Sequence, residues 1–207
     1  MLKVTEIYKS IQGESRFAGY PCIFIRLTGC NLRCSYCDTR YAYNKGKDMS
    51  IAQILDNIKP FKTKLVQITG GEPLLQKETP QLAQKLLSLG YKVLIGTNGT
   101  QDISKIDKRV VKLMDIKCPD SKESEKILWG NLRHLKINDE IKFVLCGRKD
   151  YSFAKSIVNK YGLTKSTRVV FSPSFKTLSS NKLAGWILKD GLGIRLGLQI
   201  HKYLNLA

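Results

Sequence analysis

The chain has 207 residues, of which 43% are hydrophobic and 25% are charged, a composition typical of one compact globular domain. It contains no run of about 18 apolar residues, which excludes a predicted transmembrane helix, and its first residues lack the basic-then-apolar pattern of a signal peptide. We therefore expect a single domain over residues 1–207, located in the cytoplasm. The net charge of +18 would attract anions, but the lysines are scattered along the chain. We therefore expect no membrane partner and no direct nucleic-acid partner.

From residue 22 onward, short apolar runs alternate with amphipathic stretches. The runs begin near Cys22, Leu65, Lys92, Val111, Glu140, Arg168 and Ile194. They are continuous and rich in β-branched residues, which is typical of strands buried on both faces of a parallel sheet. The run at Cys22 is interpreted as the first core strand.

Helix signals separate these predicted strands, over residues 50–58, 79–90, 150–162 and 179–191. Ser50 and Gln53 match a capping box at the first helix, and Asp150 is suited to cap the third. Glycines end the later helices. The repeated alternation of strand and helix predicts right-handed βαβ units around a parallel sheet.

About six such units fit into this length, too few for the eight-unit barrel, which needs ~250 residues. The predicted fold is therefore an α/β partial barrel, an open (β/α)6-type TIM barrel with parallel strands. In such a fold the active site lies at the carboxyl ends of the strands, where the loops converge.

Three cysteines follow the first predicted strand directly, in the spacing Cys30-x3-Cys34-x2-Cys37. Thiolates are the ligands of iron–sulfur clusters and of zinc. Three protein ligands leave one metal position open for a reactant, which favours a catalytic cluster. The alternative is structural zinc with Cys22 or a distant residue as fourth ligand, although no second C-x2-C knuckle is present.

A Gly70-Gly71-Glu72-Pro73 turn closes the second predicted strand, where glycines allow the backbone to approach a ligand closely. Together with the cysteine triplet and Tyr36, this turn resembles the radical S-adenosylmethionine (SAM) superfamily. The resemblance implies a [4Fe-4S] cluster whose free iron chelates SAM. It also implies that an electron from the cluster cleaves SAM to methionine and a 5′-deoxyadenosyl radical.

Further segments are similar to the 7-carboxy-7-deazaguanine synthase family over essentially the whole chain. They are IQGE at 11–14, GCNLRCSYCDT at 29–39 and QIHKYL at 199–204. The resemblance implies a carbon–nitrogen lyase that converts 6-carboxy-5,6,7,8-tetrahydropterin to 7-carboxy-7-deazaguanine with loss of ammonia. This is a step towards queuosine, a tRNA modification, and related 7-deazapurines, and magnesium is expected to steer it.

The same resemblance implies the roles of individual residues. Catalysis rests on the cluster ligands Cys30, Cys34 and Cys37, and Thr39 is expected to bind magnesium. The expected substrate contacts are Ile11, Gln12, Gly13, Glu14, Arg26, Thr69, His201 and the terminal carboxylate of Ala207. The expected SAM contacts are Tyr36, Cys37, Asp38, Gly71, Asp115, Ile116, Lys117, Phe171, Ser172, Pro173 and Ser174.

Arg26 is chemically suited to this role because a guanidinium can bind the substrate carboxylate in a bidentate manner. Alternation within FIRL predicts that its side chain points into the barrel. Two positions depart from the family pattern: Ser15 replaces a more usual glycine, and Gly96 stands where relatives often carry glutamate. The group that handles protons is therefore left open between Glu14, water and another residue.

Two other functions are considered. A glycyl-radical activating enzyme shares the triplet spacing but would act on a protein backbone. A non-catalytic zinc-stapled RNA-binding module would suit the positive charge but lacks an RNA-recognition motif. The expected electron donor is a flavodoxin or ferredoxin, whose acidic surface would suit this chain. The family resemblance alone implies a homodimer. The route that uses the product is left open.

Overall fold

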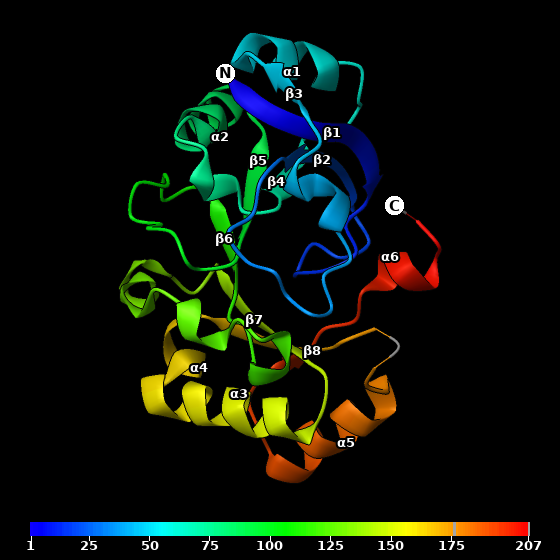
Figure 1. Cartoon of the computed structure of the whole chain (residues 1–207), viewed down its shortest axis with the longest axis vertical. Helices are drawn as coiled ribbons and strands as arrows, with labels where there is room; N and C mark the ends of the chain where they lie inside the picture. The colour runs from blue at the N-terminus through cyan, green and yellow to red at the C-terminus, as the bar shows by residue number, and fades with distance from the viewer. Residues whose placement is uncertain (176, 207) are drawn as a thin grey trace.

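The computed structural model describes residues 1–175 and 177–206, and these form one mixed sheet flanked by helices (Figure 1). The strand order is β3-β1-β2-β4-β5-β6-β7-β8-β9. Neighbours from β2 to β9 pair in parallel, and β1 pairs antiparallel with both β2 and β3. The strands are β1 (Leu2–Ile11), β2 (Pro21–Leu27), β3 (Lys47–Met49), β4 (Leu65–Gly70), β5 (Lys92–Thr97), β6 (Val111–Asp115), β7 (Glu140–Leu145), β8 (Arg168–Pro173) and β9 (Arg195–Leu196).

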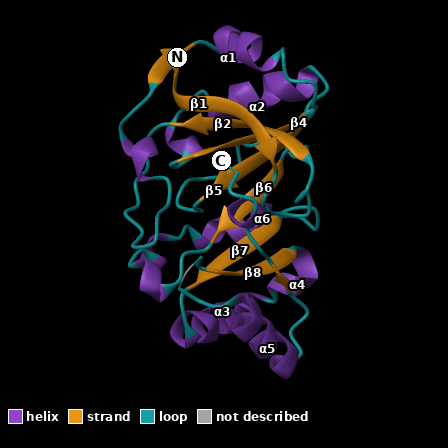
Figure 2. Cartoon of the chain, turned by 90° about the vertical axis from the view of Figure 1, so that its right-hand side faces the viewer, coloured by secondary structure: helices purple, strands orange, loops and turns teal. Residues whose placement is uncertain are grey.

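Helices α1 to α5 form an arc around the outside of the sheet, and α6 lies on its open side (Figure 1). The helices are α1 (Ile51–Ile58), α2 (Thr79–Ser88), α3 (Arg148–Tyr161), α4 (Leu163–Ser166), α5 (Ser180–Asp190) and α6 (Ile200–Tyr203). Figure 2, which views the open side, shows α6 in front of the middle of the sheet. The sheet does not close, which confirms the predicted partial barrel.

Strand β1 was missed by the pattern analysis, which began the sheet at Cys22. Its burial alternates at first, with Leu2 and Val4 buried and Lys3 exposed, because an antiparallel strand near the sheet edge has one half-solvated face. The continuous apolar run that reveals a parallel strand is therefore absent. The IQGE segment does not precede the sheet, since Ile11 is the last residue of β1.

No helix was predicted over residues 98–139, and the structure contains no α-helix there. Only turns connect β5 to β6, and three 3-10 segments (Pro119–Ser121, Ser124–Lys126 and Trp129–His134) connect β6 to β7. In the first connection Asp102 and Asp107 accept hydrogen bonds from backbone N–H groups two residues later, at 2.8 Å each. Such local bonds stabilise turns in place of helix.

The helix starts were predicted with mixed success. The capping box of α1 is confirmed, because Gln53 N donates to Ser50 Oγ at 3.2 Å and Ser50 N donates to Gln53 Oε1 at 2.8 Å. The prediction that Asp150 caps α3 is wrong, since the cap residue is Gly147. Asp150 lies in the first turn, where its buried carboxylate accepts from the backbone N–H groups of Cys146 and Asp120, each at 2.9 Å.

Side chains on the two faces of each strand pack in different places. On β2, Ile23, Ile25 and Leu27 pack outward against α1 and α2, whereas Phe24 and Arg26 face inward. A second outer core lies under α3 and α5 and includes Phe143 of β7. Inward-facing residues near the amino ends of the strands form a small apolar cluster: Cys22, Phe24, Leu65, Leu94 and Val111.

Among the described residues, no helix combines the length and apolar character needed to cross a bilayer.

Candidate active site at the carboxyl ends of the strands

The cysteine triplet lies on the loop that leaves the carboxyl end of β2. Cys34 is buried, Cys30 and Cys37 are half-buried, and all three are free thiols. The loop is anchored to the segment after β6, because Arg33 N donates to Glu123 Oε1 at 2.6 Å and Ser35 N donates to the Ser121 carbonyl at 3.1 Å. This predicted placement at a strand end is confirmed.

The residues present fit an iron–sulfur cluster. Three free thiols on one loop supply the soft ligands that such clusters require. Among residues 1–175 and 177–206 no three His, Cys, Asp or Glu side chains converge on a single ion, but each thiolate of a cluster binds a different iron. Burial raises the pKa of Cys30 and Cys34, so cluster binding must displace protons from them.

Cys22 is placed too far away to be a fourth ligand on this loop. It is the second residue of β2, at the end of the strand opposite the cluster loop. Five residues of extended strand separate it from Leu27, a distance of roughly 17 Å. Cys22 is instead fully buried in the inner apolar cluster, and burial raises its pKa to about 12.

The Gly-Gly-Glu-Pro turn packs directly against the cluster loop. Gly70 has φ +134°, and a Cβ at Gly71 would overlap the Gly29 carbonyl. Glu72 is 1% exposed, and its carboxylate accepts from Thr97 Oγ1 at 3.0 Å and from Asn98 N at 2.6 Å. The turn is therefore held between the cluster loop and the end of β5, and only glycine fits this approach.

An alternating chain of charges crosses the inner face. Lys142 of β7 donates to Glu14 Oε2 at 2.6 Å and lies 3.3 Å from Asp115 Oδ1, and Lys117 Nζ lies 3.0 Å from Asp115 Oδ2. Glu14, Asp115 and Lys117 were predicted site residues, and the structure brings them together. Lys142 was missed, although a lysine at an inward position of a core strand was an available signal.

The four charges support one another electrostatically. Burial alone would raise the pKa of Glu14, but Lys142 outweighs it and holds that pKa below its usual value. Burial opposes the charge of Asp115 as well, and Lys117 and Lys142 lower its pKa. The pKa values of both lysines are raised by these carboxylates against the effect of burial. All four groups are therefore charged at neutral pH.

The C-terminal segment is docked on the IQGE loop. Gln199 Nε2 donates to Glu14 Oε1 at 2.5 Å, and Ile200 N donates to the Gly13 carbonyl at 3.0 Å. A Cβ on Gly13 would overlap the imidazole of His201, so these residues are in direct contact. Burial lowers the pKa of His201, which favours the neutral ring. Ala207 lies outside the described residues.

Arg26, Thr69 and Gln12 lie on the same inner face, whereas Ile11 pairs with Pro21 on the opposite face of β1 and β2. Arg26 points inward, as the alternation predicted, and is the register partner of Thr69 on β4. Gln12 is buried, and its Nε2 donates to Gln67 Oε1 at 2.5 Å. The sequence did not reveal that Arg26 is already ion-paired with Glu6 of β1, at 2.6 Å.

The predicted magnesium residue lies close to the predicted SAM residue Asp38. Thr39 Oγ1 donates to Asp38 Oδ1 at 2.9 Å, and Lys202 donates to Asp38 Oδ2 at 2.6 Å. Hydroxyl and carboxylate oxygens are the donors that Mg²⁺ prefers. Lys202 therefore links α6 to the cluster loop.

Two of the predicted SAM residues have side chains turned away from the site. Ile116 and Phe171 are fully buried in the outer core, so only their backbone atoms are available to a ligand on the inner side. Ser172 is buried on the inner side, and its hydroxyl donates to the Gly197 carbonyl at 2.7 Å. Tyr36 has a buried hydroxyl with no hydrogen-bond partner among the described residues.

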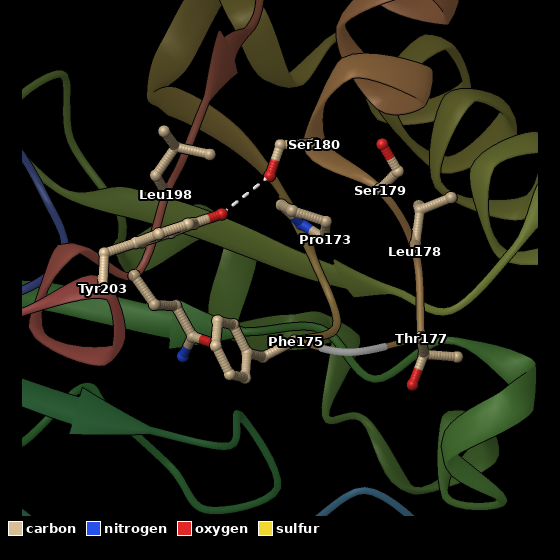
Figure 3. Close-up of a pocket in the computed structure, with 9 residues that line it drawn as sticks. Pro173, Phe175, Thr177, Leu178, Ser179, Ser180, Leu198 and Tyr203 are labelled. Carbon is tan, nitrogen blue, oxygen red and sulfur yellow. Dashed lines mark hydrogen bonds between the residues drawn. The ribbon is translucent and has the colours of Figure 1, made fainter. Parts of the chain in front are cut away.

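A pocket of about 420 Å³ opens beside α6 and is lined by Pro173, Phe175, Thr177, Leu178, Ser179, Ser180, Leu198, Gln199 and Tyr203. Figure 3 shows Leu198 and Tyr203 on one side of it and Thr177 and Leu178 on the other, with the Tyr203 hydroxyl directed at Ser180, 3.0 Å away. A cavity of about 30 Å³ on the inner face is also lined by Leu198. The C-terminal segment therefore separates the two spaces.

The arrangement agrees with what is found in known proteins. The model of the radical SAM superfamily matches residues 24–117. The 7-carboxy-7-deazaguanine synthases of Koribacter versatilis and Chlorobaculum tepidum are 43% and 41% identical to this chain, each over 98% of it and over 96% and 94% of their own lengths. The crystal structure of QueE from Escherichia coli shares the fold, with a TM-score of 0.80, 22% identity and coverage of 96% of this chain and 93% of that one. The chain therefore belongs to the 7-carboxy-7-deazaguanine synthase family of radical SAM enzymes.

Proposed function

We propose that this enzyme converts 6-carboxy-5,6,7,8-tetrahydropterin to 7-carboxy-7-deazaguanine with loss of ammonia. The supporting observation is that the IQGE loop, the C-terminal QIHK segment and the inward-facing Arg26 all lie on the inner face of the sheet whose edge carries the cysteine triplet. A glycyl-radical activating enzyme would need none of these three features, nor would a zinc-stapled RNA-binding module.

In this proposal, different residues hold the cluster and SAM. Cys30, Cys34 and Cys37 hold the [4Fe-4S] cluster. When bound, the cluster and SAM supply the 5′-deoxyadenosyl radical that starts the reaction. The residues proposed to hold SAM are Tyr36, Cys37, Asp38, Gly71, Asp115, Ile116, Lys117, Phe171, Ser172, Pro173 and Ser174, with Ile116 and Phe171 acting through their backbones.

The substrate is proposed to lie against the inner face, under the docked C-terminal segment. Arg26 binds the 6-carboxylate, and Thr39 contributes an oxygen ligand to magnesium. The other contacts are Ile11, Gln12, Gly13, Glu14, Thr69, His201 and the carboxylate of Ala207. The proton acceptor that replaces a glutamate at position 96 is Glu14, water or another group. The ion pair with Lys142 lowers the pKa of Glu14 and so makes this carboxylate a weak base.

The proposal extends to the cellular location, electron donor and oligomeric state of the enzyme. A single domain over residues 1–207 acts in the cytoplasm, where the reducing conditions suit six free cysteines. An acidic flavodoxin or ferredoxin delivers the electron, since the charge of +18 attracts it. The active form is a homodimer.

The direct test is anaerobic reconstitution with iron and sulfide, followed by incubation with SAM, magnesium, a chemical reductant and the carboxypterin. We expect 7-carboxy-7-deazaguanine and ammonia in equal amounts. If the reconstituted enzyme cleaves SAM but forms no deazaguanine, the proposed substrate is wrong. If it carries zinc and no iron, the radical mechanism is wrong as well.

A further inference from the structure

Three residues form a row across the inner face, on three neighbouring strands. Glu6 of β1 is the register partner of Arg26 of β2, and Arg26 is the register partner of Thr69 of β4. Register partners in a sheet share a face. Glu6 therefore stands beside the residue that the proposed function assigns to the substrate carboxylate.

The Arg26 guanidinium is held along one edge and lies close to two aromatic rings. Its Nε donates to Glu6 Oε1 at 2.6 Å, and its Nη2 donates to the Tyr8 hydroxyl at 2.8 Å. The rings of Tyr8 and Tyr41 lie 5.8 and 5.7 Å from the guanidinium carbon. Glu6 is itself fixed, because the Tyr41 hydroxyl donates to the same Oε1 at 2.8 Å.

A guanidinium has two edges that can grip a carboxylate with paired N–H groups. The edge formed by Nε and Nη2 is occupied by Glu6 and Tyr8. The other edge is formed by Nη1 and the second N–H of Nη2, and in the part of the chain that the structure describes Nη1 has no hydrogen-bond partner. This second edge is the one left for a ligand.

We propose that Glu6 is a positioning residue that holds Arg26 with its free edge presented to the 6-carboxylate of the substrate. The inference rests on the proposed function, in which Arg26 binds that carboxylate. Glu6 fixes the orientation of the guanidinium at some cost in affinity, because its negative charge repels the incoming anion. A ligand that lacks the carboxylate gains nothing from this arrangement, so Glu6 also contributes to selectivity.

The competing explanation is that the pair is an ordinary ion pair between neighbouring strands. Glu6 is 38% exposed, and pairs this exposed contribute little to stability. An ordinary ion pair would make every Glu6 variant slightly less stable and would affect all ligands equally. A positioning role changes the ratio of affinities for ligands with and without the carboxylate.

The test therefore compares two stable fluorescent ligands, pterin-6-carboxylate and pterin, by fluorescence titration of the reconstituted enzyme. It needs no turnover, so a failure of the proposed reaction would leave its result readable. The variants are Glu6→Gln, which keeps an acceptor for Nε, and Glu6→Ala, which does not. Asp56→Ala is the control, since it breaks an exposed pair with Lys59 elsewhere on the molecule.

We expect Glu6→Ala to weaken the binding of pterin-6-carboxylate about 10-fold, because ordering the released guanidinium costs more than the removed repulsion gains. The affinity for pterin should change by no more than about 2-fold. Glu6→Gln should bind pterin-6-carboxylate at least as tightly as wild type, because the repulsion is gone. Tyr41→Phe removes one hydrogen bond to Glu6. It should weaken the binding of pterin-6-carboxylate relative to pterin, but by less than Glu6→Ala does. An unchanged affinity ratio in Glu6→Ala, or an equal loss for both ligands, would overturn the proposal.

Discussion

The outer face of the sheet, under α1 to α5, is lined by aliphatic and aromatic side chains that are almost fully buried, whereas the inner face carries ion pairs and amides toward the carboxyl ends of the strands. The strands are shared, so alternation along each of them sends one residue to each environment. The outer residues need only fill space, and their energy comes from burial. The inner face carries charged side chains in a partly buried site, and these charges are stabilised by ion pairing. Consecutive residues of one strand therefore serve different purposes, one stabilising the fold and the next lining the site.

The largest effect is expected where the inner side meets the cluster. Cys34→Ala should abolish both iron binding and turnover, because two thiolates do not hold the cluster. Iron content after reconstitution and deazaguanine formation are the measurements. Cys146→Ala is the control, since Cys146 is a half-buried cysteine outside the triplet and its loss should leave iron content unchanged. A Cys34→Ala enzyme with full iron content would contradict the assignment.

On the outer face, Phe143→Ala should lower the free energy of unfolding by about 3–5 kcal/mol, because it leaves a cavity in a close-packed core. Phe143 is fully buried and packs edge-on against Phe171. Denaturant unfolding measures the change. Leu188→Ala, at a residue 80% exposed on α5, should stay within about 0.5 kcal/mol. Similar values for the two variants would mean that the outer core is loosely packed.

A smaller effect is expected where the C-terminal segment covers the inner face. Gly13→Ala places a methyl group where the His201 ring lies, so QIHK must move. We expect kcat/KM to fall about 10-fold, equivalent to about 1.4 kcal/mol, while the unfolding free energy changes less. Gly130→Ala is a matched control, because nothing lies within 4 Å of its added methyl group. A Gly13→Ala enzyme with the kcat/KM of the wild type would show that the docked segment is dispensable.

The smallest effect concerns the pH dependence of stability. The pKa of Glu14 is lowered in the folded state, so its contribution is present above its unfolded value near 4.5 and is lost as pH falls through the folded value. Unfolding free energies measured from pH 6 downward should therefore decrease. The slope of the unfolding free energy against pH reflects the number of protons taken up on unfolding. Glu14→Gln should lower that number by at most one. An unchanged slope would mean that Lys142 does not hold the charge of Glu14.

The fold was predictable to the extent that its strands are buried on both faces. Continuous apolar runs marked β2 and the parallel strands that follow, and strand-end motifs located the cluster loop and the glycine turn. Strand β1 escaped because its half-exposed alternation is a weak signal. The middle connections carried no helix signal, which agrees with the bonds that Asp102 and Asp107 accept from backbone N–H groups two residues later.

The site was predictable where one segment carries its own pattern, as in the cysteine triplet. It was not predictable where the meaning of a residue depends on a distant partner. Lys142 acquires a role only from Glu14, 128 positions away, and Glu6 only from Arg26 on a strand that the pattern did not pair with it. A lysine in a core strand signals an inward charge, but only the fold identifies its partner, and a glutamate on β1 gives no such signal.

The docking of Gln199 onto Glu14 joins residues 185 positions apart. During translation, the IQGE loop leaves the ribosome long before the segment that covers it has been made. A nascent chain can assemble the cysteine loop and most of the sheet, yet its inner face stays open to water until QIHK arrives. The proposed reaction therefore needs a finished chain, and a truncation a few residues before Gln199 should produce a folded protein that binds iron without confining the proposed substrate.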